Sequence, residues 1–335
     1  MKIAKFIATN GLVFLVLVLV MLGAVEVYLR LTIPGSSDVS IFEWTLDNTR
    51  YKVMKKNFRM TAWGEELRTN NLGFRDNRDT VPPKADDEFR VIVIGDSSSI
   101  SGAVPYDKIY SSLLKQRVAE KYANSDVINL AVGGYNPVQY QAVLEEVGLG
   151  LQPDLIVLAL TPDNDFNRGR EATQDLNYRR AAYGENMPKE HEGFRALFVY
   201  RAFLWRIEAR LAPLFAGASK KSDSPKDDSG WRDNLDAVRL MTDRAAELDI
   251  PFIVVLLPPN WNYVDHRKFF SKVRSEIGCE SKQFKCVDAL EAFIASGNTD
   301  KSYWINLLDS HPNARYHALV TEVLAPYVLE LVPGD

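Results

Sequence analysis

The chain has little of the chemistry that binds nucleic acids or metal ions. Only 25% of its residues are charged and the formal net charge is −4, so no basic stripe is present to neutralise phosphates. It has two cysteines and four histidines, and neither Cys279 nor Cys286 has a second cysteine or a histidine at metal-ligand spacing. These shortages exclude an electrostatic nucleic-acid binder and argue against a zinc site.

One long apolar run stands near the N-terminus. Ile7 to Val25 is almost wholly apolar, and about 20 such residues suffice to cross the roughly 30 Å hydrocarbon layer of a bilayer. Lys2 and Lys5 precede this run, so the positive-inside rule leaves the short N-terminus in the cytoplasm. Everything after Arg30 would then lie on the far side, in the periplasm or outside the cell.

A cleaved signal peptide is the alternative interpretation of this run. The sequence from Leu22 to Ala24 is a poor cleavage site, and no cysteine follows that could take a lipid. We therefore predict a single-pass anchor over residues 1–30 that is not cleaved. In the oxidising compartment beyond it, the six residues between Cys279 and Cys286 favour a disulfide across a short loop.

From residue 89 onward, apolar runs alternate with segments of helical periodicity. The apolar runs are continuous rather than alternating, so both faces of the strands should be covered by helices. Strands are expected at Phe89–Ile94, Val127–Val132, Leu155–Leu160, Pro251–Leu257 and Lys285–Val287. Helices are expected at Tyr106–Tyr122, Pro137–Gly148, Leu235–Leu248 and Asn313–Leu331. The pattern predicts a single α/β domain with a doubly wound parallel sheet.

The segment before this domain, residues 31–88, does not follow the alternation. It reads as an irregular lead-in between the anchor and the first strand. Within it, residues 69–76 have the composition of a turn, in which we expect Leu72 and Phe74 to be buried.

The domain itself, residues 89–335, contains an insertion at about 166–230. A polar, loop-like stretch opens the insertion, and an amphipathic helix is expected from Phe194 to Phe215. Residues 219–229 are too polar to bury a core and are expected to be mobile.

Residues suited to acyl transfer follow three of the predicted strands. In open parallel sheets, functional sites form beyond the carboxyl ends of the strands, and here these ends lead to Ser97, Gly134 and Asn164. Taken alone, each has an ordinary explanation as a helix cap or a turn. Near the C-terminus, Asp309 and His311 add an acid and an imidazole. A serine hydroxyl needs such a base, and an acid to orient it, before it becomes a nucleophile.

Together these segments resemble the conserved blocks of the SGNH, or GDSL-type, hydrolase family, in the same order along the chain. The matching segments are Gly95-Asp96-Ser97, residues 131–135, Asn164-Asp165 and residues 309–313. The resemblance implies a flavodoxin-like fold, an α/β/α sandwich. Residues 71–75 of the lead-in also resemble membrane-anchored bacterial members of the family.

The resemblance also implies a role for each of these residues. Ser97 is the nucleophile, His311 is the base and Asp309 orients that base. The backbone N–H groups of Ser97 and Gly134 and the side chain of Asn164 would bind the oxyanion of the intermediate. No metal or organic cofactor is implied. The remaining histidines are expected to be bystanders: His191, His266 and His317.

Two features depart from the family pattern. A proline and an aspartate stand where a glycine usually precedes Asn164, which predicts a loop of different shape. One residue separates Asp309 from His311 where many members have two. The carboxylate is then expected to reach the imidazole only if this segment is a loop, and Pro312 at the start of the last helix would be consistent with that.

The function expected from this set is that of an extracytoplasmic serine esterase. Its substrate would be an O-acyl group, O-acetyl above all, on a cell-envelope or exported glycan, and no protein partner is indicated. Trp261 and Tyr263 either stack on a sugar ring or pack the rim of the site. The alternatives are an O-acyltransferase that uses the same residues and a non-catalytic scaffold of a polysaccharide export complex.

Overall fold

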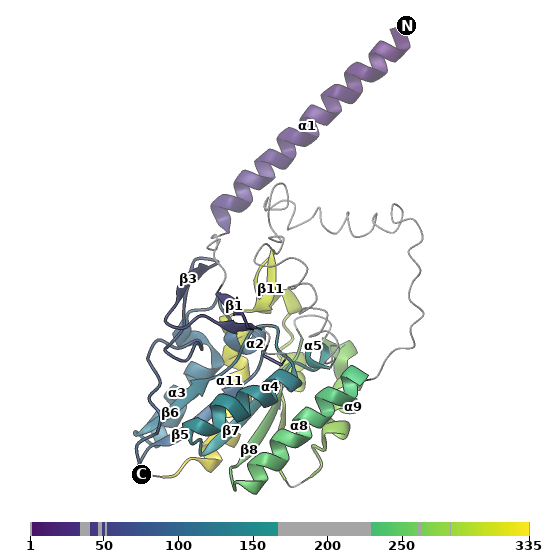
Figure 1. The fold of residues 1–335 in the computed structure, drawn as a ribbon. Coiled ribbons are helices and arrows are strands. Elements are labelled where there is room, and N and C mark those ends of the chain that lie inside the picture. The colour runs from purple at the N-terminus through teal and green to yellow at the C-terminus, as the bar shows by residue number, and fades with distance from the viewer. Residues whose placement is uncertain are drawn as a thin grey trace.

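A five-stranded parallel sheet lies at the centre of the computed structural model (Figure 1). The strands are β5 (Phe89–Ile94), β6 (Ser125–Asn129), β7 (Leu155–Leu160), β8 (Phe252–Leu256) and β9 (Lys285–Asp288). Their spatial order is β6-β5-β7-β8-β9, which corresponds to the flavodoxin-like arrangement. The structure describes residues 2–33, 41–45, 49–50, 52–166, 229–259, 263–281 and 283–334.

Helices cover both faces of this sheet. They are α2 (Ser97–Ile100), α3 (Tyr110–Lys121), α4 (Pro137–Val143), α5 (Pro162–Asp165), α8 (Ser229–Glu247), α9 (Arg267–Ile277), α10 (Leu290–Ala295) and α11 (Ala314–Leu331). Helices α3 and α11 pack together on one face, and α4 and α8 pack together on the other (Figure 1). Every residue of β5, β7 and β8 is consequently buried. This confirms the predicted doubly wound α/β fold.

Element boundaries differ from the expectation where polar side chains or short helices intervene. Strand β6 ends at Asn129 rather than at Val132, because the Asn129 side chain accepts the N–H of Ala131 and turns the chain. A 3₁₀ turn precedes α3, and a π turn follows α4 within the segments predicted as single helices. Helices α9 and α10 were not predicted.

The lead-in is more regular than its sequence suggests. It contains two antiparallel hairpins, in which β1 (Phe42–Trp44) pairs with β2 (Lys52–Met54) and β3 (Arg59–Ala62) pairs with β4 (Glu65–Arg68). Strands of three or four residues are too short to show a clear alternation of apolar and polar positions. A third hairpin, of β10 (Trp304–Asn306) and β11 (Asp309–Pro312), lies near the C-terminus.

Residues 69–76 of the lead-in attach it to the domain. Phe74 is buried as expected, whereas Leu72 is only half-buried. Arg75 is 1% exposed, and its guanidinium donates to the carbonyl of Ile100 at 2.7 Å and to the carbonyls of Ser101 and Val104. Since these carbonyls lie at or just beyond the end of α2, Arg75 holds the chain that follows Ser97.

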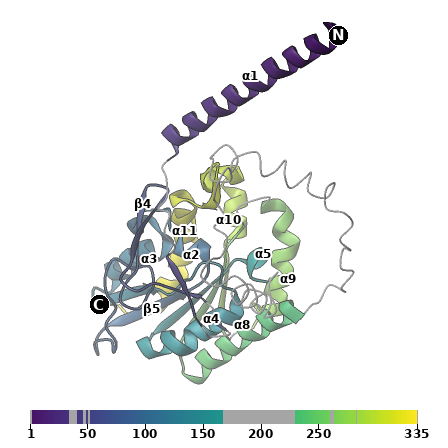
Figure 2. The same ribbon diagram turned by 45° about the horizontal axis from the view of Figure 1, so that its top comes forward.

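A single long helix, α1 (Lys2–Thr32), precedes the lead-in and projects from the domain (Figure 1). Its segment Asn10–Thr32 is long and apolar enough to cross a membrane, and a signal sequence meets the same criterion. Leu29 in the last turn of α1 and Ile33, which follows the helix, contact the rest of the protein, and both are buried. Figure 2 shows this end of the helix above β4.

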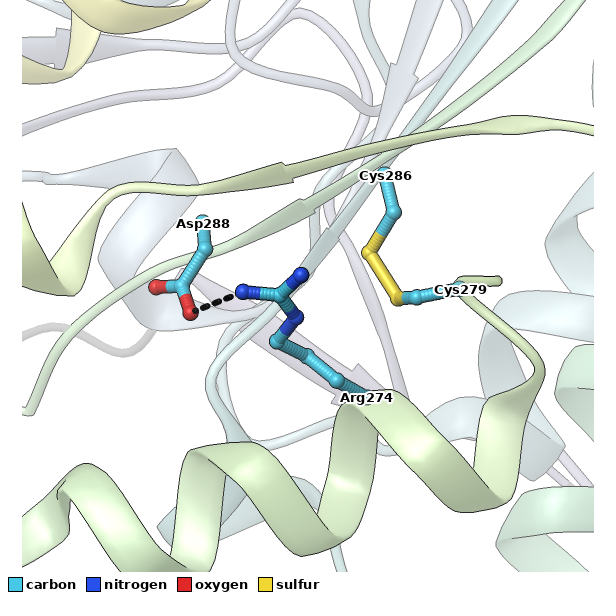
Figure 3. The surroundings of a disulfide bond; sticks show 4 residues. All are labelled: Arg274, Cys279, Cys286 and Asp288. Carbon is cyan, nitrogen blue, oxygen red and sulfur yellow. Dashed lines mark hydrogen bonds and ion pairs between the residues drawn. A yellow bond between two sulfur atoms is a disulfide. The ribbon is translucent and has the colours of Figure 1, made fainter. Parts of the chain in front are cut away.

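Cys279 and Cys286 form a disulfide, as the sequence predicts (Figure 3). Cys279 follows the end of α9, and Cys286 lies on β9. Beside the disulfide, Arg274 of α9 pairs with Asp288 of β9 at 3.4 Å. The disulfide and the ion pair therefore join the same helix to the edge strand of the sheet.

Several expectations lie outside the described residues. They concern the polar stretch that opens the insertion, His191, the helix from Phe194 to Phe215, the polar stretch at 219–228 and the position of Trp261. Within the expected insertion, the structure describes residue 166 and the first residues of α8.

Candidate active site

The end of β5 brings Ser97 to the carboxyl edge of the sheet. Ser97 is the first residue of the short helix α2, and the carboxylate of Asp96 caps that helix by accepting the N–H of Ser98 at 2.8 Å. The capping role that a serine could have taken here thus belongs to Asp96. The side chain of Ser97 is half-buried and lines two cavities.

His311 lies between Ser97 and Asp309. Its Nε2 is 3.2 Å from Ser97 Oγ, and its Nδ1 is 2.6 Å from Asp309 Oδ1. The same carboxylate oxygen accepts the backbone N–H of His311 at 2.9 Å. Three residues predicted from two distant parts of the sequence therefore meet as hydroxyl, imidazole and carboxylate, in the order that nucleophilic catalysis needs.

The segment that carries the acid and the imidazole is strand β11, which corrects the expectation of a loop. Residues two positions apart in a strand point to the same face, so the Asp309 carboxylate and the His311 imidazole meet without a loop. Helix α11 begins at Ala314 with Asn313 as its cap. Pro312 is therefore the last residue of the strand and not the start of the helix.

A residue that sequence reasoning missed holds the other oxygen of Asp309. Trp63 Nε1 donates to Asp309 Oδ2 at 2.6 Å, although the two residues are 246 positions apart in the chain. Trp63 is 9% exposed and lies in the two-residue turn between β3 and β4. The Trp63-Gly64 pair could have suggested a turn, but no local signal indicates so distant a partner.

These contacts set the charge of the site. Burial would raise the pKa of Asp309, but the hydrogen bonds from His311 and Trp63 outweigh it and lower the pKa to about 2. The hydrogen bond to Asp309 raises the pKa of His311 above its ordinary value, burial opposes this rise, and the charges of Asp309 and Asp96 add to it. At neutral pH the carboxylate is ionised, and it stabilises an imidazolium beside Ser97.

The two other residues predicted for the oxyanion site lie at the same cavity as Ser97. Asn164 and Gly134 both line it, and a Cβ added to the adjacent Gly133 would lie 3.7 Å from Ser97 Cβ. Gly134 has a φ of 76°, a region that favours glycine. The Gly133-Gly134 loop therefore passes directly beside the serine.

Asn164 is oriented by a carboxylate that the sequence suggested only as part of a motif. Its Nδ2 donates to Asp96 Oδ2 at 2.7 Å, and Asp96 is 1% exposed. Burial raises the pKa of Asp96, while the hydrogen bonds from Ser98 and Asn164 oppose that rise. The proline and aspartate before Asn164 form the first turn of α5 rather than a loop, and this turn directs the amide toward Asp96.

Two cavities open at Ser97. The larger, of about 480 Å³, runs beneath the hairpins of the lead-in and is lined by apolar side chains and Lys52. Its apolar lining includes Ile41, Phe42, Met60, Leu67, Ile100 and Ile305. The smaller, of about 270 Å³, is lined by Thr161, Asp163 and Pro258. The lead-in, which the sequence predicts to be irregular, thus forms one wall of the site.

Tyr263 does not lie at the rim of the site. It is 4% exposed and packs against Phe293 and Tyr303 at ring-centroid distances of 5.5 and 6.2 Å, so it belongs to the core. His317, expected to be a bystander, is fully buried and stacks on Tyr110 at 5.8 Å. Within the ranges that the structure describes, no three His, Cys, Asp or Glu side chains are grouped to hold a metal ion.

The chain matches no family model and no curated protein. Among solved structures it is similar to an acetylxylan esterase from Geobacillus stearothermophilus, at 12% identity and a TM-score of 0.45, with 76% of this chain and 98% of that chain covered. It is also similar to a G-D-S-L family protein from Desulfitobacterium hafniense, at 12% identity and a TM-score of 0.40, with 71% and 98% covered. A third similar structure is an α/β hydrolase enzyme from the Lake Arreo metagenome, at 13% identity and a TM-score of 0.41, with 73% and 97% covered. Similarities at this level do not assign a function, so the geometry around Ser97 must do so.

Proposed function

We propose that the protein is a serine ester hydrolase that works through an acyl-Ser97 intermediate. The observation that carries this proposal is the contact of one imidazole with both Ser97 Oγ and Asp309 Oδ1. In this arrangement His311 Nε2 accepts the hydroxyl proton while Ser97 Oγ attacks the ester carbonyl. Asp309 keeps the other imidazole nitrogen protonated and stabilises the imidazolium that forms.

The remaining steps use the same groups. The tetrahedral intermediate carries a negative oxygen, which the N–H groups of Ser97 and Gly134 and the amide of Asn164 would bind. Collapse breaks the bond to the alkoxy oxygen, which takes the proton from His311 Nε2 and leaves as the alcohol. Water then gives a proton to His311 and attacks the acyl carbon, and Ser97 regains its proton as the acid departs.

For the substrate we infer an O-acyl group, such as O-acetyl, on a cell-envelope or exported glycan. The apolar helix α1 with Lys2 and Lys5 before its membrane-length segment supports a domain held outside the cytoplasm. The cavity of about 480 Å³ beside Ser97 supports a substrate larger than an acetyl group alone, because it leaves room for a sugar ring. The family resemblance of the sequence motifs supports ester chemistry.

The test uses the full chain in detergent micelles with a fluorophosphonate probe and a short acyl ester. We expect Ser97→Ala to lose probe labelling and to lower turnover by about 10⁴-fold or more, because nucleophile and base act as a unit. Ser98→Ala, which removes the neighbouring hydroxyl, serves as the matched control and should retain both. Labelling that persists in Ser97→Ala would contradict the proposal.

Acetylated polysaccharide then tests the substrate class. A glycan esterase should release free acetate from it, and Ser97→Ala should abolish the release. If the acyl group instead appears on an added oligosaccharide, the protein is a transferase that uses the same serine.

A further inference from the structure

Both oxygens of the Asp309 carboxylate are engaged, and by different parts of the chain. Oδ1 accepts the Nδ1–H and the backbone N–H of His311, both within β11. Oδ2 accepts the indole N–H of Trp63, which comes from the lead-in. A carboxylate fixed at one oxygen can still turn about its χ2 torsion, which is a broad, soft rotation. The second hydrogen bond therefore sets the direction in which Asp309 faces the imidazole.

The backbone of Trp63 takes a conformation that is unusual for a bulky residue. Its φ is 47°, in the left-handed region that bulky side chains avoid, and Gly64 follows with a φ of 87°. A two-residue hairpin turn of this kind has positive φ at both positions and favours asparagine, aspartate or glycine there, so tryptophan is a costly residue at the first of them. The hydrogen bond to Asp309 and an apolar cluster around the indole stabilise Trp63 at this position.

That apolar cluster includes the end of the N-terminal helix. Leu29 of α1 and Ile33, the residue that follows the helix, are buried together with Trp63, and Ile305 and Leu308 of the β10–β11 hairpin region pack against them. Figures 1 and 2 both show the last turn of α1 close to the lead-in hairpins. Trp63 thus contacts two elements. One is the hairpin region that carries Asp309, and the other is the end of the helix that would enter the membrane.

We propose that Trp63 is a positioning residue for Asp309, and that α1 holds Trp63 in place and so couples the N-terminal helix to the active site. This inference rests on the proposed function for its catalytic consequence. In this role Trp63 acts through the carboxylate of Asp309. The N-terminal helix is then a structural part of the active site as well as an anchor.

The first test replaces Trp63 by phenylalanine in the full chain. Phenylalanine keeps most of the apolar bulk and removes the N–H, so kcat should fall about 10- to 100-fold, the range for one hydrogen bond to a charged group, with KM changed less than kcat. Trp231→Phe is the matched control, because Trp231 Nε1 donates to the Glu276 carboxylate at 2.7 Å, and it should keep the wild-type kcat. Equal kcat values in the two variants would overturn the proposal.

A second variant separates the hydrogen bond from packing. β-(3-Benzothienyl)alanine has the shape of tryptophan with sulfur in place of the N–H, so placing it at position 63 preserves the fold even if Trp63→Phe does not. The same loss of kcat is expected. Wild-type kcat with this residue would show that Trp63 acts by bulk alone and would overturn the positioning role.

An NMR titration of the His311 imidazole makes the result independent of ester turnover. If Trp63 directs the carboxylate, its loss should lower the raised pKa of His311 toward the ordinary value, while Trp231→Phe leaves it unchanged. This shift in a protein that hydrolyses no ester would support the positioning role and refute the proposed function. If the wild-type protein hydrolyses esters but the pKa of His311 is unchanged in Trp63→Phe, the proposed function is supported and the positioning role is refuted.

The role of α1 is tested by two identical substitutions on the same helix. Leu29 belongs to the cluster around Trp63 and is 4% exposed, whereas Leu31 is 81% exposed. Leu29→Ala should lower kcat about two- to fivefold by loosening the cluster around the indole, and Leu31→Ala should not change it. Equal kcat values would show that α1 does not contribute to the site.

Discussion

The two sides of the active site come from different structural elements, the central sheet and a separate hairpin. Ser97 follows β5, which is buried on both faces within the five-stranded sheet. Asp309 and His311 lie on a two-stranded hairpin outside that sheet, and the His311 side chain is 54% exposed. The difference indicates that changes on the hairpin side alter activity with little effect on stability, and that changes in the sheet do the reverse.

Among changes on the hairpin side, the largest effect is expected from Asp309→Asn. The amide has no negative charge to stabilise the imidazolium, and it can present its NH₂ to His311 and favour the wrong tautomer. We expect kcat to fall about 10³- to 10⁴-fold. Because the hairpin lies outside the sheet, the free energy of unfolding should stay close to the wild-type value, as measured by urea denaturation. A large loss of stability would show that the hairpin and sheet are not independent in this way.

The reverse effect is expected in the sheet. Leu158 on β7 is fully buried, and Leu158→Ala leaves a cavity that should lower the free energy of unfolding by about 2–5 kcal/mol. Activity per folded molecule, measured by titrating active sites with the fluorophosphonate, should be unchanged. A variant that is stable but inactive would contradict the division into two sides.

A smaller effect on stability is expected at the disulfide, which lies on the far edge strand. Replacing Cys279 and Cys286 by serine should lower the free energy of unfolding by about 2 kcal/mol, since the closed loop is short. Activity should not change, because neither cysteine lines the cavities at Ser97. If the folded variant lost activity, the structure of β9 would be shown to affect the active site, contrary to this prediction.

The smallest expected effect is a shift in the pH dependence. Turnover needs neutral His311, so kcat/KM should fall as the pH drops through the pKa of His311, which Asp309 raises above about 6.5. Removing that carboxylate in Asp309→Asn should move the acid limb to lower pH. Asp163, whose pKa burial raises to about 6, titrates nearby, so Asp163→Asn is the control and should leave the limb in place.

The sheet could be predicted from sequence because its signal is local. Strands β5 and β7 end at the predicted residues, since a strand buried on both faces must be apolar throughout. The hairpins of the lead-in carry no such signal, because strands of three or four residues are too short for a period to emerge. Their position depends on contacts with the domain.

The candidate site divides in the same way. The motifs around Ser97 and His311 could be recognised because each is a short run of residues with a known chemical use. Trp63 could not, because its role depends on a hydrogen bond across 246 positions and no spacing rule reaches that far. The hydrogen bond from Asn164 to Asp96 could not be predicted either, because it depends on the ends of two strands lying side by side.

The hydrogen bond between Trp63 and Asp309 also has a consequence for synthesis. Ribosomes make the lead-in early and β11 almost last. The hydrogen bond between Trp63 and Asp309 therefore cannot form until nearly the whole chain has emerged. The contact between Ser97 and the His311 imidazole cannot form earlier either, since the two residues are 214 positions apart. Each closure joins distant segments, and such contacts form late in folding. We therefore expect nascent or prematurely terminated chains to be unable to cleave esters, so that hydrolytic activity begins only with completed molecules.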